Sequence, residues 1–417
     1  MINYDAFLSR AAGQMQESAI RRMGTVLAQS RDIISFAPGY PATDTFPWTE
    51  FSEIARELLA GGDGSVLQYG PTRGYAPLLG AIEGIMQARG VATAVDNLLV
   101  TTGSQQGLDL VARVLLDPDD IVLVELPTYT GAITAFRNVQ ARMVGVRQES
   151  DGVDLDALDE TWQRLVREHQ RVRMLYLVPN FQNPTGLLIG LEKRRRLLAW
   201  AERRNVLIVE DDPYRELYFE DSATEQDVRP LKADDADGRV VYLSSFSKTL
   251  APGYRVAWID APTALVSKLE MAKQAEDLCT GALDQRIIFE ACRRGVLDRQ
   301  LPLLRAHYQE KRDVMVGALR EEFRHEMTWP TPRGGFFLWA TLPDHIDADA
   351  MIECAVRHGV IYVAGSAFFV EPLGRHTLRL AFSAPSPEQI RVGVARLGAA
   401  VREYEGAPAA SRQTGGR

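Results

Sequence analysis

Short apolar runs alternate with amphipathic stretches through the middle of the 417-residue chain. The runs are rich in Val, Ile and Leu and have no alternating polar positions, as in "IVLVEL", "MLYLV", "VLIVE" and "VVYL". Such runs are typical of strands buried on both faces of a parallel sheet. Between them, stretches such as residues 191–205 place apolar residues at helical spacing. The pattern predicts an α/β fold in which helices sandwich a mostly parallel sheet.

The pattern changes after about residue 260. Long helical stretches there lead to three short apolar runs, "GGFFLWATL", "GVIYVAG" and "TLRLAFS". We predict a large domain over residues 46–295 and a smaller α+β domain formed by residues 1–45 and 296–405. Residues 406–417 lack apolar anchors and are predicted to be a disordered tail.

Composition narrows the possible functions. The 47 basic and 55 acidic residues give a net charge of −8 without a long basic run, which argues against a nucleic-acid partner. No apolar run is long enough for a membrane span, and the N-terminus lacks the apolar core of a secretory signal. Cys279, Cys292 and Cys354 are not at metal-ligand spacing, and the six histidines form no pair. We therefore expect a cytoplasmic protein with reduced thiols and no metal site.

Five polar signatures follow the apolar runs: "TTGSQQG", "PTY", "NPTG", "DDPY" and "SFSK". Each alone is compatible with an ordinary turn. Open α/β sheets, however, bind ligands at the carboxyl ends of their strands. Five such signatures in series therefore predict one shared crevice, although about 150 residues separate the first from the last.

Lys248 in "SFSKTLAPGYR" is the candidate nucleophile, since the other five lysines lie in charged or polar stretches. A buried amine near a cation loses its proton more easily, and Arg255 follows after a Pro-Gly turn. Hydroxyls such as that of Ser245, together with an arginine, are good phosphate ligands. Gly103 would let the turn before Ser104 present N–H groups at a helix N-terminus. The combination indicates an aldehyde cofactor that carries a phosphate.

Four further residues could bind the ring of such a cofactor. Asp211 ends an apolar run, where its carboxylate needs a partner such as a protonated pyridine nitrogen. The ring of Tyr129 could stack on the cofactor ring, while Asn183 and Tyr214 could donate hydrogen bonds to a ring oxygen.

Taken together, these motifs resemble the class I/II aminotransferases, which are fold type I pyridoxal-phosphate enzymes. The resemblance is closest to the branch of 2-aminoadipate and kynurenine aminotransferases, and it covers nearly the whole chain, from "ISFAPGYPATDTFP" to "LRLAFS". It implies the aspartate-aminotransferase-like fold, pyridoxal 5'-phosphate as cofactor, and a homodimer whose sites are shared between subunits.

The resemblance also implies roles for individual residues. Lys248 would form the Schiff base and transfer the proton, with Asp211 and Tyr214 as the other catalytic residues. Cofactor binding is implied for Ser104, Gln105, Tyr129, Asn183, Asp211, Tyr214, Ser245, Lys248, Arg255 and, from the neighbouring subunit, Tyr69. Substrate binding is implied for Gly39, Asn183, Arg379, Arg21 and Tyr40.

Two of the substrate residues keep alternative interpretations. Arg21 matches a position that can bind a distal carboxylate or swing aside for an aromatic substrate, yet a solvated helical arginine fits equally. Arg379 suits a carboxylate, but an exposed strand arginine would show the same pattern. Tyr40 and Tyr254 replace the leucines that are usual in this branch, so the substrate specificity of the branch does not carry over.

The function implied is transamination between an L-amino acid and a 2-oxo acid, with 2-oxoglutarate as the expected acceptor, by a ping-pong mechanism. A lyase or decarboxylase on the same fold stays open, because the reaction depends on which Cα bond the enzyme aligns. A ligand-sensing regulator is less favoured, since too few residues precede "ISFAPGYP" for a winged-helix domain. The S-x-x-K motif of penicillin-binding proteins is rejected because S-D-N and K-T-G are missing.

Overall fold

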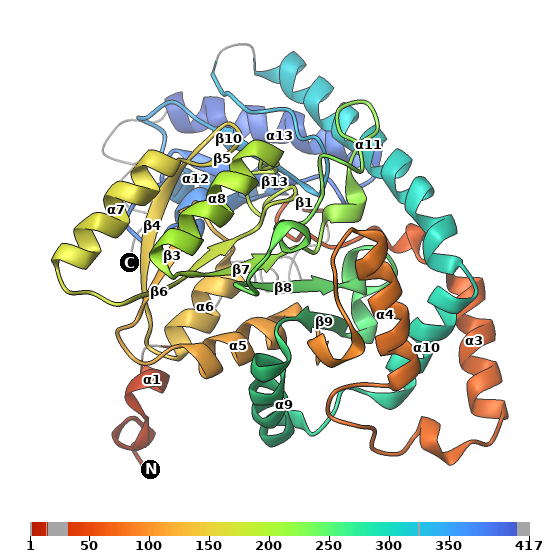
Figure 1. Cartoon of the computed structure of the whole chain (residues 1–417). Coiled ribbons are helices and arrows are strands. Elements are labelled where there is room, and N and C mark those ends of the chain that lie inside the picture. Colours follow the sequence, from red (N-terminus) through yellow and green to blue (C-terminus); the bar gives the residue numbers. More distant parts are fainter. Residues whose placement is uncertain (1, 14, 16–31, 324–325, 407–417) are drawn as a thin grey trace.

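The computed structural model describes residues 2–13, 15, 32–323 and 326–406. Its centre is an eight-stranded sheet with the order β2-β9-β8-β7-β6-β3-β4-β5 (Figure 1). The strands of this sheet are β2 (Leu98–Thr102), β3 (Ile121–Leu126), β4 (Arg142–Glu149), β5 (Gly152–Val153), β6 (Val172–Leu177), β7 (Leu207–Asp211), β8 (Val240–Ser245) and β9 (Val256–Asp260).

The predicted mostly parallel sheet is confirmed, with one reversed strand inside it. Strands β4, β3, β6, β7 and β8 run parallel, whereas β9 is antiparallel to both of its neighbours, β2 and β8. Residues 246–255 connect β8 to β9, which is too short for the crossover that parallel strands need. Because β9 is reversed between them, β2 runs in the same direction as β8.

Helices cover both faces of this sheet, as its apolar strands require. Val122 and Val124 of β3 pack in a core with α5, α6 and α9, while Ile121 and Leu123 pack on the other face with α7 and α8. Helices α4 and α10 cover the second face near β2 and β9, with α3 beside α10. These helices are α3 (Trp48–Ala60), α4 (Ala76–Ala88), α5 (Ser104–Leu115), α6 (Thr130–Asn138), α7 (Leu155–Arg167), α8 (Leu191–Arg204), α9 (Thr263–Asp277) and α10 (Ala282–Arg293).

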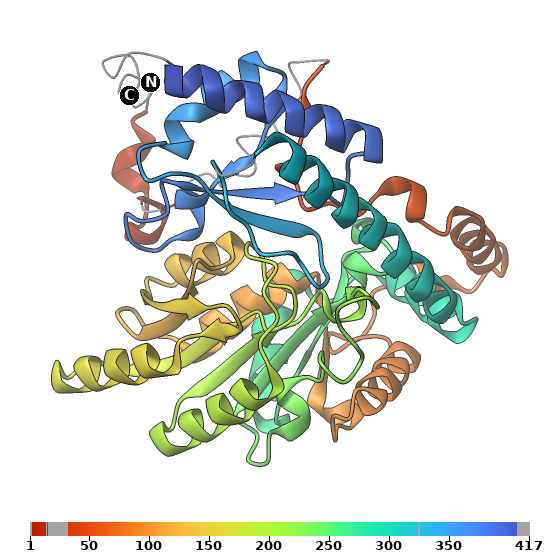
Figure 2. The same cartoon turned by 90° about the horizontal axis from the view of Figure 1, so that it is seen from above.

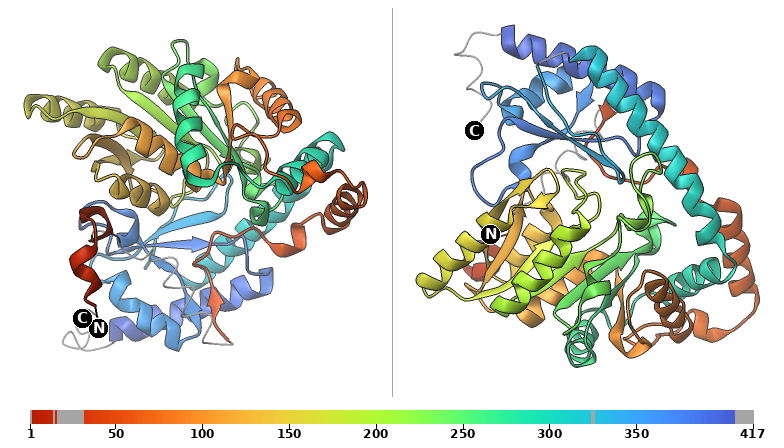
Figure 3. Two further views of the ribbon diagram at one scale, coloured as in Figure 1. Left: turned by 90° about the horizontal axis from the view of Figure 1, so that it is seen from below. Right: turned by 45° about the horizontal axis from the view of Figure 1, so that its top comes forward.

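The C-terminal strands form a separate small sheet with the order β10-β13-β12. Near it, β1 pairs with β11, so that residues 34–35 lie with the C-terminal part of the chain (Figure 2). Helix α11 extends from this part toward α10 and α3, as both views of Figure 3 show. The elements of this part are β1 (Ile34–Ser35), α11 (Val296–Glu322), β10 (Phe337–Thr341), α12 (Ala348–Arg357), β11 (Val360–Ile361), β12 (Val363–Ala364), β13 (Thr377–Ala381) and α13 (Pro387–Gly406). Helix α1 (Arg10–Gly13) instead contacts α6.

Several predictions about the chain ends and boundaries stay open. The domain boundaries at residues 45 and 295 remain a prediction. Helix α13 includes Gly406, and the rest of the predicted tail lies outside the described residues, as does Arg21. Within the described ranges, no helix combines the length and the apolar character needed to cross a bilayer.

Candidate active site

The polar signatures after the strands meet at one edge of the large sheet. Strands β2, β3, β6, β7 and β8 share one direction, so their carboxyl ends lie at this edge. Since β9 runs the opposite way, Arg255, the residue before it, lies there too. A hollow of about 500 Å³ lies at this edge. Its lining includes every predicted site residue except Tyr69 and Arg21: Gly39, Tyr40, Ser104, Gln105, Tyr129, Asn183, Asp211, Tyr214, Ser245, Lys248, Arg255 and Arg379.

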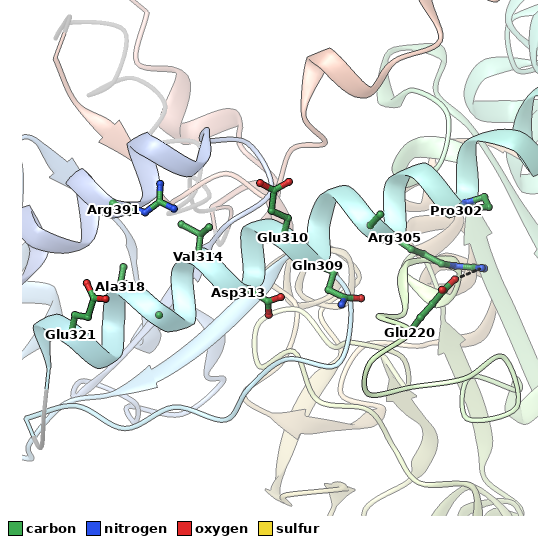
Figure 4. A pocket seen from close by; sticks show the side chains of 12 residues that line it. Glu220, Pro302, Arg305, Gln309, Glu310, Asp313, Val314, Ala318, Glu321 and Arg391 are labelled. Carbon is green, nitrogen blue, oxygen red and sulfur yellow. Dashed lines mark ion pairs between the residues drawn. The ribbon is translucent and has the colours of Figure 1, made fainter.

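A second hollow, of about 780 Å³, lies along α11 and shares no lining residue with the first (Figure 4). Acidic side chains of α11, among them Glu310 and Asp313, line it. Arg305 points toward Glu220, with 3.9 Å between Nη1 and Oε1. The lining contains no lysine. The hollow around Lys248 is therefore the candidate active site.

Lys248 ends a short 3₁₀ helix, Phe246–Lys248, that follows directly after β8. Its Nζ donates to the carbonyl oxygen of Gly39 at 3.4 Å and lies 5.8 Å from the ring centre of Tyr214. Burial, together with the nearby cations Arg255 and Arg379, lowers the pKa of Lys248 to about 8, while Asp211 opposes this shift. The amine is thus uncharged in a large share of molecules near pH 8, as a nucleophile requires.

Asp211 is the last residue of β7 and is buried. Its Oδ2 accepts a hydrogen bond of 2.8 Å from the hydroxyl of Tyr176, whereas its Oδ1 is buried without a partner among the described residues. Burial raises the pKa of Asp211 to about 7, and the bond from Tyr176 opposes that rise. A buried carboxylate oxygen without a donor is expected where a cationic ligand group binds.

The N-terminus of α5 and the loop after β8 form a candidate phosphate cradle. Gly103 caps α5 with a φ of 79°, and a Cβ on it would lie 2.0 Å from Nη2 of Arg255. The guanidinium of Arg255 therefore lies against the backbone where Ser104 begins the helix. Ser245 accepts a hydrogen bond from the backbone N–H of Ser247 at 2.9 Å, and both hydroxyls line the hollow. Helix N–H groups, hydroxyls and an arginine together suit a phosphate.

The other three residues predicted to bind the ring, besides Asp211, also line the hollow. Tyr129 caps α6, and burial raises the pKa of its hydroxyl to about 12, so it stays protonated. Tyr214 is buried edge-on against Phe336 and Phe337, with ring centres 5.5 and 5.8 Å away. Asn183 is buried as well, and its Oδ1 already accepts a hydrogen bond from Arg379. Their contacts with a ring stay a prediction.

Arg379 is a buried cation rather than an exposed strand residue. Its Nη1 donates to Oδ1 of Asn183 at 2.7 Å, its Nη2 donates to the carbonyl oxygen of Ala37, and its Nε has no partner among the described residues. The guanidinium lies 4.3 Å from the ring centre of Phe337. Burial lowers the pKa of Arg379 to about 10, so it is still charged at neutral pH. A buried guanidinium without a carboxylate partner suits an anionic substrate group.

The remaining predicted residues lie elsewhere or at the rim. Tyr40 is 64% exposed and lines the hollow, and its carbonyl oxygen accepts a hydrogen bond from Ser383. Tyr69 is 79% exposed and does not line the hollow of its own chain, which is compatible with a role in a neighbouring subunit. Arg21 is outside the described residues.

Sequence reasoning missed Phe337, which lines the hollow, and Tyr176, which donates a hydrogen bond to the lining residue Asp211. Phe337 packs against both Arg379 and Gly39, where a Cβ on the glycine would lie 2.3 Å from its ring. Tyr176 lies inside the apolar run "MLYLV", whose pattern predicts only a strand. The signal available was a hydroxyl-bearing side chain in an otherwise apolar strand, which needs a buried partner.

One group of described side chains brings possible metal ligands together, away from the hollow: Cys354, His358 and Glu403. One oxygen of Glu403 accepts a hydrogen bond from Arg357 at 2.7 Å, and the other lies 2.7 Å from Nε2 of His358. Both oxygens thus have partners within the protein, and the absence of a metal site stays an expectation.

The hollow fits pyridoxal phosphate in three respects. The amine of Lys248 can hold an aldehyde, and the unpartnered oxygen of Asp211 can pair with a protonated pyridine nitrogen. Because Gly103 has no side chain, the guanidinium of Arg255 can lie against the N-terminus of α5, and together they can bind the phosphate.

Comparisons with known proteins agree with this fit. Residues 31–397 match the family model of aminotransferase class I and II. Aromatic-amino-acid aminotransferase 1 of Thermococcus litoralis is 40% identical over 403 residues, which cover 96% of this chain and 95% of that protein. A 2-aminoadipate transaminase of Thermus thermophilus is 40% identical over 401 residues, 96% of this chain and 98% of that protein.

A solved structure supports the same assignment. Kynurenine aminotransferase of Pyrococcus horikoshii superposes with a TM-score of 0.92 at 37% identity, covering 97% of this chain and 99% of that one. The chain therefore belongs to the class I and II aminotransferases, pyridoxal-phosphate-dependent enzymes of fold type I with the aspartate-aminotransferase-like fold.

Proposed function

We propose that the enzyme transfers the amino group of an L-amino acid to a 2-oxo acid, with 2-oxoglutarate as acceptor, by a ping-pong mechanism through Lys248. The observation that carries the proposal is the position of one amine. Nζ of Lys248 lies in a hollow that also contains the unpartnered oxygen of Asp211 and the buried guanidinium of Arg379.

Bound pyridoxal phosphate supplies an aldehyde for the amine and a ring that withdraws electrons from Cα of the amino acid. In this proposal, ionised Asp211 holds the proton on the pyridine nitrogen, while Asn183 and Tyr214 bind the ring hydroxyl oxygen. Tyr129 stacks on the ring. The phosphate is held by side chains from two loops and by the N-terminus of α5: Ser104, Gln105, Ser245 and Arg255.

Lys248 has two tasks in this scheme. Its uncharged Nζ holds the aldehyde, and its low pKa leaves a usable fraction of the uncharged form. The same amine would also act as the base that removes the proton from Cα of the substrate. Arg379 orients the substrate for this transfer by binding its carboxylate, with Gly39 beside it and Tyr40 at the rim.

The donor and the acceptor are best tested together in a half-reaction screen. The purified holoenzyme is mixed with single amino acids, and the visible absorbance of the bound cofactor is recorded. We expect at least one donor among aromatic, branched-chain and acidic amino acids, including 2-aminoadipate and kynurenine, to abolish the visible band. Addition of 2-oxoglutarate should then restore it.

The same screen separates the alternatives. Release of ammonia, carbon dioxide or pyruvate without conversion of the cofactor to its amine form would assign a lyase or a decarboxylase instead. Binding of amino acids without any turnover would favour a ligand-sensing regulator. Failure of 2-oxoglutarate alone, with another oxo acid effective, would change only the acceptor.

We also propose that the enzyme is a cytoplasmic homodimer. In support, Tyr69 is exposed and lies outside the hollow of its own chain, and none of the three cysteines is in a disulfide. The division into residues 46–295 and residues 1–45 with 296–405 belongs to the same proposal. In such a dimer the hydroxyl of Tyr69 reaches the phosphate at the partner's site.

Replacing Tyr69 with phenylalanine should therefore weaken retention of the cofactor by about tenfold, the size expected for one hydrogen bond to a charged group. The measurement is cofactor release followed by absorbance. Tyr4, which is 71% exposed, provides the matched control, and Tyr4→Phe should retain the cofactor as the wild type does.

Mixed dimers test whether the site is shared. In a dimer of one Tyr69→Phe subunit and one Lys248→Ala subunit, a shared site pairs the intact Lys248 with the intact Tyr69. Wild-type retention should then return at that site. Retention that stays weak in the mixed dimer would show that Tyr69 acts only within its own chain.

A further inference from the structure

The hydroxyl of Tyr176 donates a hydrogen bond to the side chain of Asp211. It lies 2.8 Å from Oδ2 of Asp211, and Tyr176 is completely buried. No second hydrogen bond is described for this carboxylate, because Oδ1 has no partner among the described residues. Among the described residues, the side chain of Asp211 is therefore held by the bond from Tyr176, which leaves Oδ1 unpartnered.

The sheet places the two side chains on one face. Strand β6 pairs in parallel with β7, and Tyr176 lies opposite Val209, two residues before Asp211. Side chains two residues apart along a strand point to the same face. The ring of Phe136 from α6 packs edge-on against the ring of Tyr176, with centres 5.6 Å apart. Tyr129, the proposed stacking residue, caps the N-terminus of that same helix.

The bond favours the ionised carboxylate, because the charged form accepts a hydrogen bond more strongly than the neutral form does. Other groups act on the same carboxylate from each neighbouring element. Lys248, after β8, favours the charged form, whereas Asp212, next in the chain, opposes it. The hydroxyl of Tyr129 lies close enough to Asp211 for its own pKa to rise in response. Burial opposes the charge most strongly, so removing the bond would make Asp211 easier to protonate.

We propose that Tyr176 is a positioning residue for the reaction: its hydroxyl fixes Oδ2 of Asp211, so that a charged Oδ1 faces the hollow and holds the proton of a pyridine nitrogen there. The inference rests on the proposed function, since it gives Tyr176 a task only when a pyridine ring lies in the hollow. Tyr176 itself is not among the residues that line the hollow.

The test compares two buried tyrosines of the sheet that each donate a hydrogen bond to an aspartate, although Tyr242 also accepts one from Arg89 at 2.8 Å. Tyr176→Phe removes the hydroxyl and keeps the ring against Phe136. Tyr242→Phe is the matched control, because Tyr242 is equally buried, lies on β8, and donates to Oδ2 of Asp212 at 2.9 Å. Neither Tyr242 nor Asp212 lines the hollow. Each holoenzyme is prepared with ¹⁵N-labelled pyridoxal phosphate, and thermal unfolding is measured for both variants.

Three readouts separate positioning from a structural role. In Tyr176→Phe, the pyridine ¹⁵N signal should move toward the position of the unprotonated ring, and the pH at which the visible band changes should shift. The kcat should fall about tenfold or more, while KM for the amino donor changes less than about twofold. Tyr242→Phe should keep the wild-type ¹⁵N signal and kcat even if its melting temperature falls.

Two outcomes would overturn the inference. One is an unchanged ¹⁵N signal in Tyr176→Phe, whatever happens to kcat. The other is an equal shift in both variants, which would indicate a general loosening of the sheet. Failure of the wild type to convert any amino acid in the half-reaction screen would instead contradict the proposed function, so the two failures can be told apart.

Discussion

Replacing Lys248 with alanine should abolish transamination, with kcat reduced by about 10⁴-fold. Lys248→Ala removes the amine that holds the aldehyde and also the base that takes the proton from Cα. A positioned general base alone contributes about 10²–10⁴-fold to a rate. The measurements are amino-acid conversion with 2-oxoglutarate and the visible band of the bound cofactor. Both should be lost, while the far-UV circular dichroism spectrum stays that of the wild type.

Lys193 is the matched control for this experiment. It is also buried, and its Nζ pairs with Glu149 and Asp151 instead of lying in the hollow. Lys193→Ala should retain both the visible band and the transamination rate, although its melting temperature should fall. An active Lys248→Ala enzyme with an unchanged band would refute the assignment of the amine.

The second large effect is expected at Asp211. Asp211→Asn keeps the shape of the side chain but removes the charge that holds the proton on the pyridine nitrogen. Breaking a buried charge pair costs about 3–5 kcal/mol, which corresponds to a loss in kcat of about two to four orders of magnitude. Rapid-mixing kinetics of the half-reaction should place the loss in removal of the Cα proton, and the cofactor should still bind to Lys248.

Asp260 provides a control at the opposite edge of the same sheet. It is buried at the end of β9, and burial raises its pKa to about 6, so its environment resembles that of Asp211. Asp260→Asn should leave the half-reaction rate within about twofold of the wild type, because surface and structural substitutions far from a site act mainly on stability. A normal half-reaction rate in Asp211→Asn would mean that another group protonates the ring.

Much of the fold could be predicted because the strands are buried on both faces. The apolar runs "IVLVEL", "MLYLV", "VLIVE" and "VVYL" are the strands β3, β6, β7 and β8 of the large sheet. Strand β4, Arg142–Glu149, was missed because it lies near the edge of the sheet. Arg142 and Arg147 are exposed there, so the strand has no continuous apolar run. The reversed direction of β9 also depends on the length of its connection rather than on its own residues.

The candidate site was predictable from the direction of the strands. Signatures that follow strands of one direction must meet at one edge, and those around Ser104, Tyr129, Asn183, Asp211 and Lys248 do so. Phe337 and Tyr176 could not be found in this way, since their place depends on packing between distant segments and on strand register. The sequence could not decide whether Arg379 binds a carboxylate or lies exposed on a strand, because the burial of a side chain cannot be derived from one strand alone.

The reversed strand β9 has a further consequence for residues 246–255. Both ends of this loop are anchored in neighbouring strands, with Ser245 opposite Ala257 in the ladder. Lys248 and Arg255 therefore lie on a short loop with both ends fixed. The loop cannot shift along the sheet without breaking hydrogen bonds between β8 and β9. Surface loops generally tolerate insertions well, but an extra residue here would move the amine and the arginine relative to each other. Engineering of the substrate range should therefore keep the loop of residues 246–255 at its native length and change residues around Tyr40 instead.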